Sequence, residues 1–239
     1  MKNYNLENYN NYGTEQSIPM QAAISSFMTK VYGWMSFALL LTGLTAFAVA
    51  GSETMLSLIF SSSTVFFGLL IAELALVFII SAAINKLSYN VLTALFVLYS
   101  LINGATLSVI FLAYTTGSIT STFLVCAATF GSMTLFGLVT KKDLSGWGKI
   151  LILGLIGIII ASIVNLFLAN STMDWVITYL GVIIFVGLTA YDTQKLKNLS
   201  LQIQDETTAK KLSIMGALTL YLDFINLFLY LLKILGKRK

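Results

Sequence analysis

This chain consists largely of apolar runs of about 20 residues, which short polar segments separate. Such a run can cross the hydrocarbon of a bilayer as one helix, and a soluble core does not need several of them. The run 87–140 is too long for one crossing, and the polar segment 114–118 divides it into two helices joined by a tight turn. The pattern predicts an all-α polytopic membrane protein with seven transmembrane helices, over residues 31–52, 64–85, 87–140 (two helices), 150–169, 175–191 and 214–235.

The N-terminal segment does not share this pattern. Asn, Tyr and Gln crowd residues 2–16 without an apolar period, which favours a disordered or interfacial tail. We therefore divide the chain into a disordered or interfacial N-terminal tail over 1–25, a membrane domain over 26–236 and a basic C-terminal tail over 237–239.

The composition narrows the class of protein further. Of 239 residues, 57% are hydrophobic and 10% are charged, whereas soluble domains carry about 25% charged residues. These values exclude a soluble globular protein, a disordered chain and a nucleic-acid binder. Histidine is absent, which excludes a His-ligated metal site and a Ser-His-Asp triad, and the single Cys126 permits no internal disulfide. We expect neither enzymatic activity nor a cofactor.

The basic residues are distributed unevenly among the predicted loops. With the N-terminus inside, the outer loops hold Glu53 and Asp174 and no basic residue. This positive-inside pattern predicts a cytoplasmic N-terminus and six full crossings. A seventh full crossing would place Lys233 and residues 237–239 outside, so the sequence leaves the exit side of the last helix open. The inner segments hold Lys2, Lys30, Lys86, Lys141, Lys142, Lys149, Lys195, Lys197, Lys210 and Lys211.

Small residues mark the expected contacts between helices. In membranes such residues let two helix backbones approach closely. On this basis we expect helix contacts at Ala127, Gly131, Gly154, Gly157 and Gly181.

Three acidic residues, Glu73, Asp192 and Asp223, lie within apolar runs. An ionised carboxylate at the bilayer centre costs at least about 2.5–3.5 kcal/mol, so each is expected to face the bundle interior. Asp223 shares a polar helix face with Thr219 and Asn226. The alternatives remain open: Asp223 could only specify helix packing, and Glu73 could be either a cation-pathway residue or a protonated structural acid.

Asp192 and Asp223 are expected to approach one another. The sixth span runs toward the inner face and the seventh starts there, so the two carboxyl groups can come within about one or two helical turns. Two carboxylates in a low-dielectric site do not both ionise easily, so the pair holds a proton near neutral pH. At higher pH a dianion would attract a cation, and Ca²⁺ prefers carboxylate oxygens. For Asp192, an interfacial pairing with Lys195 is the alternative.

Intramembrane aspartyl proteases also use two aspartates within membrane helices. Tyr191-Asp192 matches the first of their three motifs. However, Leu220-Tyr221-Leu222 precedes Asp223 where those proteases have Gly-x-Gly, and no proline follows it. We therefore do not favour proteolysis.

Two stretches around the aspartates, Gly187-Leu-Thr-Ala-Tyr-Asp-Thr-Gln194 and Ala217-Leu-Thr-Leu-Tyr-Leu-Asp-Phe-Ile-Asn-Leu-Phe-Leu229, carry a resemblance to a known family. Val31-Tyr-Gly-Trp34, Thr42-Gly-Leu-Thr45 and Glu73 support it. On these residues the chain resembles the Bax inhibitor-1 family, also called the transmembrane Bax inhibitor motif family. The similarity covers residues 27–235.

The resemblance implies six helices around a central C-terminal one and an association with pH-sensitive Ca²⁺ leak. It also implies that Asp192 and Asp223 form a hydrogen-bonded pH sensor, contacted by a latch arginine near the inner end of the second helix. Residues 81–86 contain no arginine here. Lys86 is the candidate replacement, although it lacks the bidentate fork of arginine. Bacterial relatives are linked to regulation of a membrane-bound ATP-dependent protease, and this short Asn- and Lys-rich chain fits a bacterial plasma-membrane member.

We predict a pH-sensitive Ca²⁺ leak channel or transporter with no resident cofactor, whose partners are the lipid bilayer, Ca²⁺ and protons. Asp192 and Asp223 form the sensor and a transient Ca²⁺ site, and Glu73, Asp223 and Asn226 line the ion pathway. The alternative is an interaction protein that regulates a membrane protease or another partner without ion flux of its own. Proton-coupled transport of a small solute is a third option, but no broken helix or anion-binding glycine loop favours it.

Overall fold

The computed structural model describes residues 7–239, with side chains described from Gln21 onward. Over this range the chain is helical apart from short connections, and seven helical segments are long and apolar enough to cross a membrane. This confirms the predicted all-α polytopic class. The helices are α1 (Glu7–Ala50), α2 (Glu53–Phe60), α3 (Ser63–Ala82), α4 (Tyr89–Leu107), α5 (Val109–Ala113), α6 (Thr116–Val139), α7 (Ser145–Leu168), α8 (Ser171–Ser200) and α9 (Glu206–Leu235).

Short polar segments stop one helix and cap the next. The turn predicted at 114–118 is present, because α5 ends at Ala113 and the Thr115 side chain accepts a hydrogen bond from the Ser118 backbone N–H at the start of α6. Asn170 caps α8 and Asp205 caps α9 in the same way. These side chains satisfy backbone N–H groups that have no partner inside the helix. The polar positions between apolar runs therefore set the helix boundaries.

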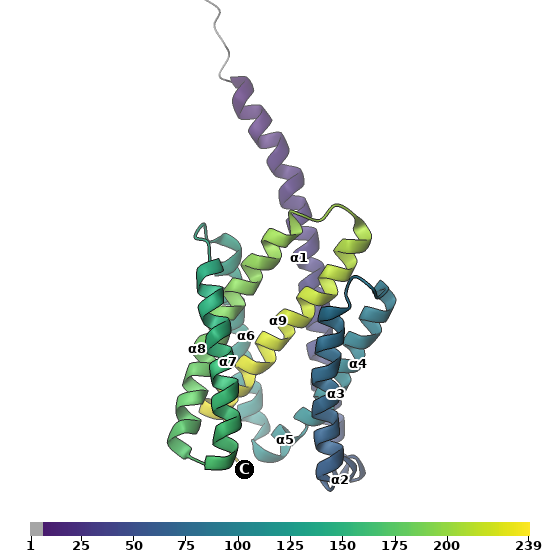
Figure 1. The fold of residues 1–239 in the computed structure, drawn as a ribbon, viewed down its shortest axis with the longest axis vertical. Coiled ribbons are helices and arrows are strands. Elements are labelled where there is room, and N and C mark those ends of the chain that lie inside the picture. Colours follow the sequence, from purple (N-terminus) through teal and green to yellow (C-terminus); the bar gives the residue numbers. More distant parts are fainter. Residues whose placement is uncertain (1–6) are drawn as a thin grey trace, which may run out of the picture.

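The last helix, α9, forms the centre of the bundle. It runs obliquely across the other helices in Figure 1. Of the residues in its most apolar stretch, 67% are buried, whereas only 6% are buried in the corresponding stretch of α7. It packs against α1, α3, α4, α6 and α8. The outward side chains of α7 are large and apolar, as a surface facing lipid requires. The arrangement of six helices around a central C-terminal one is therefore present.

The structure also decides where α9 ends relative to the other helices. In Figure 1 the C-terminus lies at the end of the bundle opposite the α6–α7 and α8–α9 loops. Lys233 forms an ion pair with Asp174 at the start of α8. The backbone N–H of Thr115 donates to the carbonyl of Lys237 at 3.0 Å, and that of Lys239 donates to the carbonyl of Ala113 at 3.0 Å. The last helix thus crosses the bundle fully, and the tail 237–239 is paired with the α5–α6 turn.

The N-terminal segment, predicted as a disordered or interfacial tail over 1–25, is in part the beginning of α1. The structure continues α1 back to Glu7, so most of the range 1–25 is helical, while residues 1–6 lie outside the described part of the chain. A helix satisfies its backbone hydrogen bonds internally. A segment without an apolar period can therefore still form a helix. The part of α1 apolar enough to cross a membrane starts at Gln21, and the helix before it projects beyond the bundle in Figure 1.

The glycine contacts match the expectation only in part. Gly154 lies against the side chain of Ile184, and Gly181 lies against the ring of Tyr230, whereas Gly131 and Gly157 have no atom within 4 Å of an added Cβ. The expectation was wrong at these two, because they face away from neighbouring helices. A closer approach was missed at Gly104 in α4.

Substituting alanine for Gly104 is expected to destabilise the protein. The new methyl would lie 2.6 Å from the backbone carbonyl oxygen of Thr42, so α1 and α4 would have to separate. Overpacking of this kind costs about 1–3 kcal/mol, which corresponds to about 2–12 °C in Tm for a chain of this size. Thermal unfolding of the purified protein measures the shift. Gly43→Ala, on an exposed face of α1 with nothing within 4 Å, is the matched control, and equal shifts in the two variants would contradict the argument.

Candidate functional site

A single cavity brings together the three acidic residues predicted from the sequence. It has a volume of about 920 Å³, lies between α3 and α7, and is also lined by α4, α8 and α9. Glu73 enters it from α3, Asp192 from α8 and Asp223 from α9. Asn226, predicted as an ion-pathway residue, lines the same cavity. The rest of its wall is mostly apolar, so the acids form a polar patch in a low-dielectric environment.

Asp192 and Asp223 lie on the neighbouring helices α8 and α9 and line this cavity together. They expose only 8% and 4% of their surface and are close enough for their charges to interact. Asp192 lies in the second half of α8 and Asp223 in the middle of α9. A hydrogen bond between two carboxyl groups requires one proton. The second oxygen of Asp223, Oδ2, is buried without a hydrogen-bond partner among the described residues. The site therefore has spare acceptor capacity for a proton or a cation.

Glu73 belongs to a different cluster of polar residues. Its Oε1 accepts a hydrogen bond from the Thr106 hydroxyl at 2.7 Å, and its Oε2 accepts one from the Asn103 amide at 3.2 Å. The Tyr221 hydroxyl donates to Asn103 Oδ1 at 2.8 Å and lies 2.6 Å from the Thr42 hydroxyl. This network links α3, α4, α9 and α1 through the bundle.

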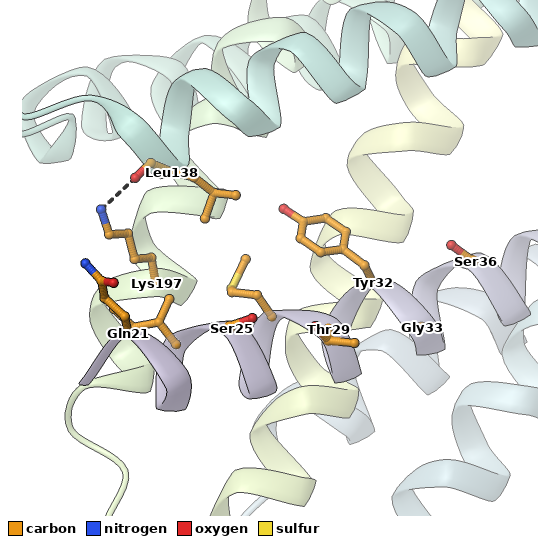
Figure 2. Close-up of a pocket in the computed structure, with 10 residues that line it drawn as sticks. Gln21, Ser25, Thr29, Tyr32, Gly33, Ser36, Leu138 and Lys197 are labelled. Carbon is orange, nitrogen blue, oxygen red and sulfur yellow. Dashed lines mark hydrogen bonds between the residues drawn. The ribbon is translucent and has the colours of Figure 1, made fainter. Parts of the chain in front are cut away.

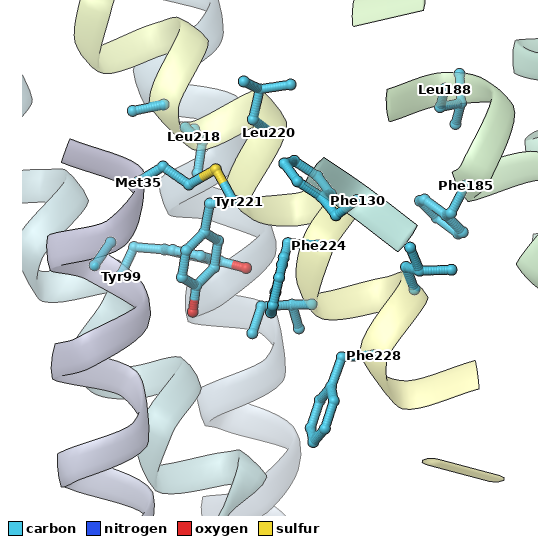
Figure 3. Packing of buried hydrophobic residues seen from close by; sticks show 14 of the residues in the cluster. Met35, Tyr99, Phe130, Phe185, Leu188, Leu218, Leu220, Tyr221, Phe224 and Phe228 are labelled. Carbon is cyan, nitrogen blue, oxygen red and sulfur yellow. The ribbon is translucent and has the colours of Figure 1, made fainter. Parts of the chain in front are cut away.

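The network sits within aromatic packing. Figure 3 shows Tyr221 close to Tyr99 among buried apolar side chains, and their ring centroids are 5.7 Å apart in an edge-to-face arrangement. Phe96 packs on the same ring at 6.0 Å. Tyr221 thus points from α9 to the side opposite Asp223, toward α1 and α4. The central helix therefore carries polar groups on two different faces.

Sequence reasoning missed most of this network. Asn103 and Thr106 are spaced three residues apart in an apolar run, so they share one face of α4. That spacing of polar residues in a membrane segment was the signal that could have found them. No sequence pattern relates Thr42 and Tyr221, which are 179 residues apart and are joined only by the packing of α1 on α9.

The structure does not bring Lys86 to the aspartate pair. Helix α3 ends at Ala82, and Lys86 lies exposed in the following turn, outside the cavity lining.

Asn226 does line the cavity, with its amide donating to the carbonyl of Leu222 in its own helix at 2.8 Å. In the described part of the chain, no three acidic, Cys or His side chains gather closely enough to hold a metal ion. Two carboxylates supply too few oxygens for the six to eight ligands of a resident Ca²⁺.

Six membrane helices arranged around a central C-terminal one, with two aspartates on the last two helices, define a polytopic membrane protein with an intramembrane acidic site. The chain belongs to the Bax inhibitor family, because the family model "Inhibitor of apoptosis-promoting Bax1" matches residues 24–239.

Bacterial proteins are similar over nearly the whole chain. The inner membrane protein YbhL of Escherichia coli K12 is 52% identical over 228 residues, which cover 95% of this chain and 97% of the relative. A protein of Borreliella burgdorferi is 47% identical over 216 residues, covering 90% and 93% of the two chains. A protein of Rickettsia prowazekii is 40% identical over 228 residues, covering 95% of each.

Proposed function

We propose that this protein is a pH-sensitive Ca²⁺ leak channel or transporter in which Asp192 and Asp223 form the pH switch. The observation that carries the proposal is that Glu73, Asp192 and Asp223 line one cavity of about 920 Å³ inside the bundle. An acidic side chain inside a membrane is energetically costly, and helix packing alone does not require three of them in one cavity. Acidic residues that share an intramembrane cavity therefore favour a pathway for ions or protons.

The switch follows from the charge of the pair. With one proton, the hydrogen bond joins α8 to α9. Without it, two negative charges repel each other in a low-dielectric site and attract a hard cation. Asp192, Asp223 and Asn226 then offer oxygen atoms to a passing Ca²⁺, and Glu73 offers a second acidic position along the cavity.

Other charged or titratable groups lie on the helices that pack around the pair, and the walls contributed by α7 are apolar. Among them Lys195, one turn along α8 from Asp192, opposes the negative charge. Because Lys86 lies outside the cavity lining, we assign the role of the latch to Lys195. The groups are Tyr191 and Lys195 on α8, Tyr221 and Tyr230 on α9, Glu73 on α3, Tyr99 on α4, Cys126 on α6 and Tyr32 on α1.

We further propose that the protein lies in a bacterial inner membrane with its N-terminus in the cytoplasm. The name of the relative YbhL supports the membrane, and the lysines in the α3–α4, α6–α7 and α8–α9 loops support the orientation. The basic C-terminus then lies outside, where Asp174 neutralises Lys233. These ionic and backbone contacts explain how the last helix crosses against the usual charge rule.

Ca²⁺ flux into proteoliposomes tests the function directly. Liposomes that contain the purified wild-type protein are expected to take up Ca²⁺ faster than empty liposomes. The rate is expected to change between about pH 5 and pH 8, an interval in which the pKa of a perturbed carboxyl group can lie. Because protons and Ca²⁺ compete for the same carboxylates, the Ca²⁺ concentration for half-maximal flux is expected to fall as pH rises. Absence of flux from folded protein would overturn the proposal and favour the role of a partner-binding membrane protein.

A further inference from the structure

A second large cavity lies on the opposite side of the bundle. It has a volume of about 740 Å³ and lies between α1 and α6 against α8, at the end where the α6–α7 and α8–α9 loops lie (Figure 2). It shares no lining residue with the cavity of the aspartate pair. The two cavities are therefore separate sites, and a ligand of this one need not involve the proposed ion pathway.

The cavity combines a polar stripe with apolar walls. Gln21, Ser25, Thr29, Tyr32 and Ser36 recur every three or four residues along α1, so they share one helix face, and all five line the cavity. Ile24, Met28 and Leu138 provide apolar surface beside them. A polar stripe facing outward from a membrane helix suits a ligand that carries both polar and apolar parts.

Lys197 supplies the charge. It reaches the cavity from α8, and its ammonium group donates to the carbonyl of Leu138 at the end of α6 at 2.6 Å, as Figure 2 shows. An ammonium group has three N–H donors, so this contact leaves donor capacity for a ligand. Among the lining residues that the structure describes, Lys197 is the charged one, and none is acidic. The cavity therefore favours an anion.

Another cavity lies further along α1 and α6, in the direction of the membrane normal, and shares no lining residue with the first. This smaller cavity, of about 210 Å³, is lined by aromatic and aliphatic side chains from Leu39 onward. Leu39 follows Thr29 by ten residues, a helix rise of about 15 Å, which is half of the ~30 Å hydrocarbon thickness. A chain anchored beside Thr29 would thus reach the second cavity within one leaflet.

We propose that the larger of these two cavities binds an anionic phospholipid, with its phosphate on Lys197, its polar headgroup along the α1 stripe and an acyl chain running toward Leu39. The height of the site suits a headgroup, because the surrounding loops carry Lys141 and Lys142, which mark the membrane surface. Tyr32 also contacts Thr193 at 3.4 Å. A bound lipid would therefore lie against the segment of α8 that carries Asp192.

Native mass spectrometry of the full-length protein tests the proposal. The protein is exchanged into micelles containing equal amounts of phosphatidylglycerol and phosphatidylethanolamine, and the retained lipids are counted. The wild type is expected to retain phosphatidylglycerol preferentially. Lys197→Gln is expected to lower that preference about tenfold, the factor for loss of one charge-assisted hydrogen bond. Lys197→Arg is expected to keep it.

Two controls make the result decisive. Lys149→Gln removes the same charge from an exposed site on α7 outside the cavity and is expected to change nothing. Thr29→Phe, at an exposed position that lines the cavity, is expected to lower lipid retention without touching Lys197, which covers the case in which Lys197→Gln fails to fold. An unchanged lipid preference in folded Lys197→Gln or in Thr29→Phe overturns the proposal. Displacement of the lipid by inorganic phosphate would also overturn it, because the ligand would then be a free anion.

Discussion

Replacing Asp223 with asparagine is expected to abolish the pH dependence of Ca²⁺ flux through this protein. Asparagine keeps the shape of the side chain and can still donate a hydrogen bond to Asp192, so the contact between α8 and α9 survives. It cannot lose the proton that the wild-type pair shares. The pair is then locked in its joined form, and flux is expected to stay at one low level across about pH 5 to 8.

The same experiment separates the pair from a general effect of removing acid groups. Asp192→Asn is expected to give the same flat profile, and the double variant is expected to add nothing, because both substitutions remove one shared proton site. Asp143→Asn, on an exposed residue before α7 and far from the cavity lining, is the matched control and is expected to keep the wild-type profile. A normal profile in Asp223→Asn would contradict the assignment of the pair as the sensor, even if flux itself persisted.

Replacing Asn103 with leucine is expected to destabilise the protein by disrupting the polar network between α3, α4 and α9. The amide of Asn103 donates to Glu73 and accepts from Tyr221, so leucine leaves an acid and a hydroxyl group without these partners inside the bundle. Glu73 keeps its hydrogen bond from Thr106, and Tyr221 keeps its contact with Thr42, so the variant loses two hydrogen bonds without leaving either group wholly unpaired. At about 0.5–1.5 kcal/mol for each bond, the expected loss is about 1–3 kcal/mol, which corresponds to a fall of about 2–12 °C in Tm.

A graded series checks this explanation by thermal unfolding. Tyr221→Phe removes only the hydroxyl, while Thr42 keeps its hydrogen bond to the carbonyl of Ser100. Its cost should approach the average of about 0.6 kcal/mol for a hydrogen bond between membrane helices. Asn226→Leu is the matched control, because that amide bonds only to the carbonyl of Leu222 in its own helix. Similar shifts for Asn103→Leu and Asn226→Leu would show that the network does not hold α3, α4 and α9 together.

The candidate site was only partly readable from the sequence. Glu73, Asp192 and Asp223 were found because a charge in an apolar run is costly wherever the run packs. The partners of Glu73 were not found, because Asn103 and Thr106 are polar residues of a kind that many membrane helices contain. The position of Lys86 relative to the aspartates could not be predicted from the sequence either, because a lysine that follows a helix end can point toward or away from the bundle.

The class of this protein, the number of its membrane helices and the acidic residues that must avoid lipid could all be predicted from the amino-acid sequence. The length and apolar content of a run, and the cost of a charge within it, are local properties. Tertiary structure decided the rest. It placed α9 at the centre, put three acids from three helices around one cavity and held the basic C-terminus at the end opposite the lysine-rich loops. These features depend on which helix faces meet, and contacts between residues far apart in sequence, such as Thr42 and Tyr221, leave no local pattern.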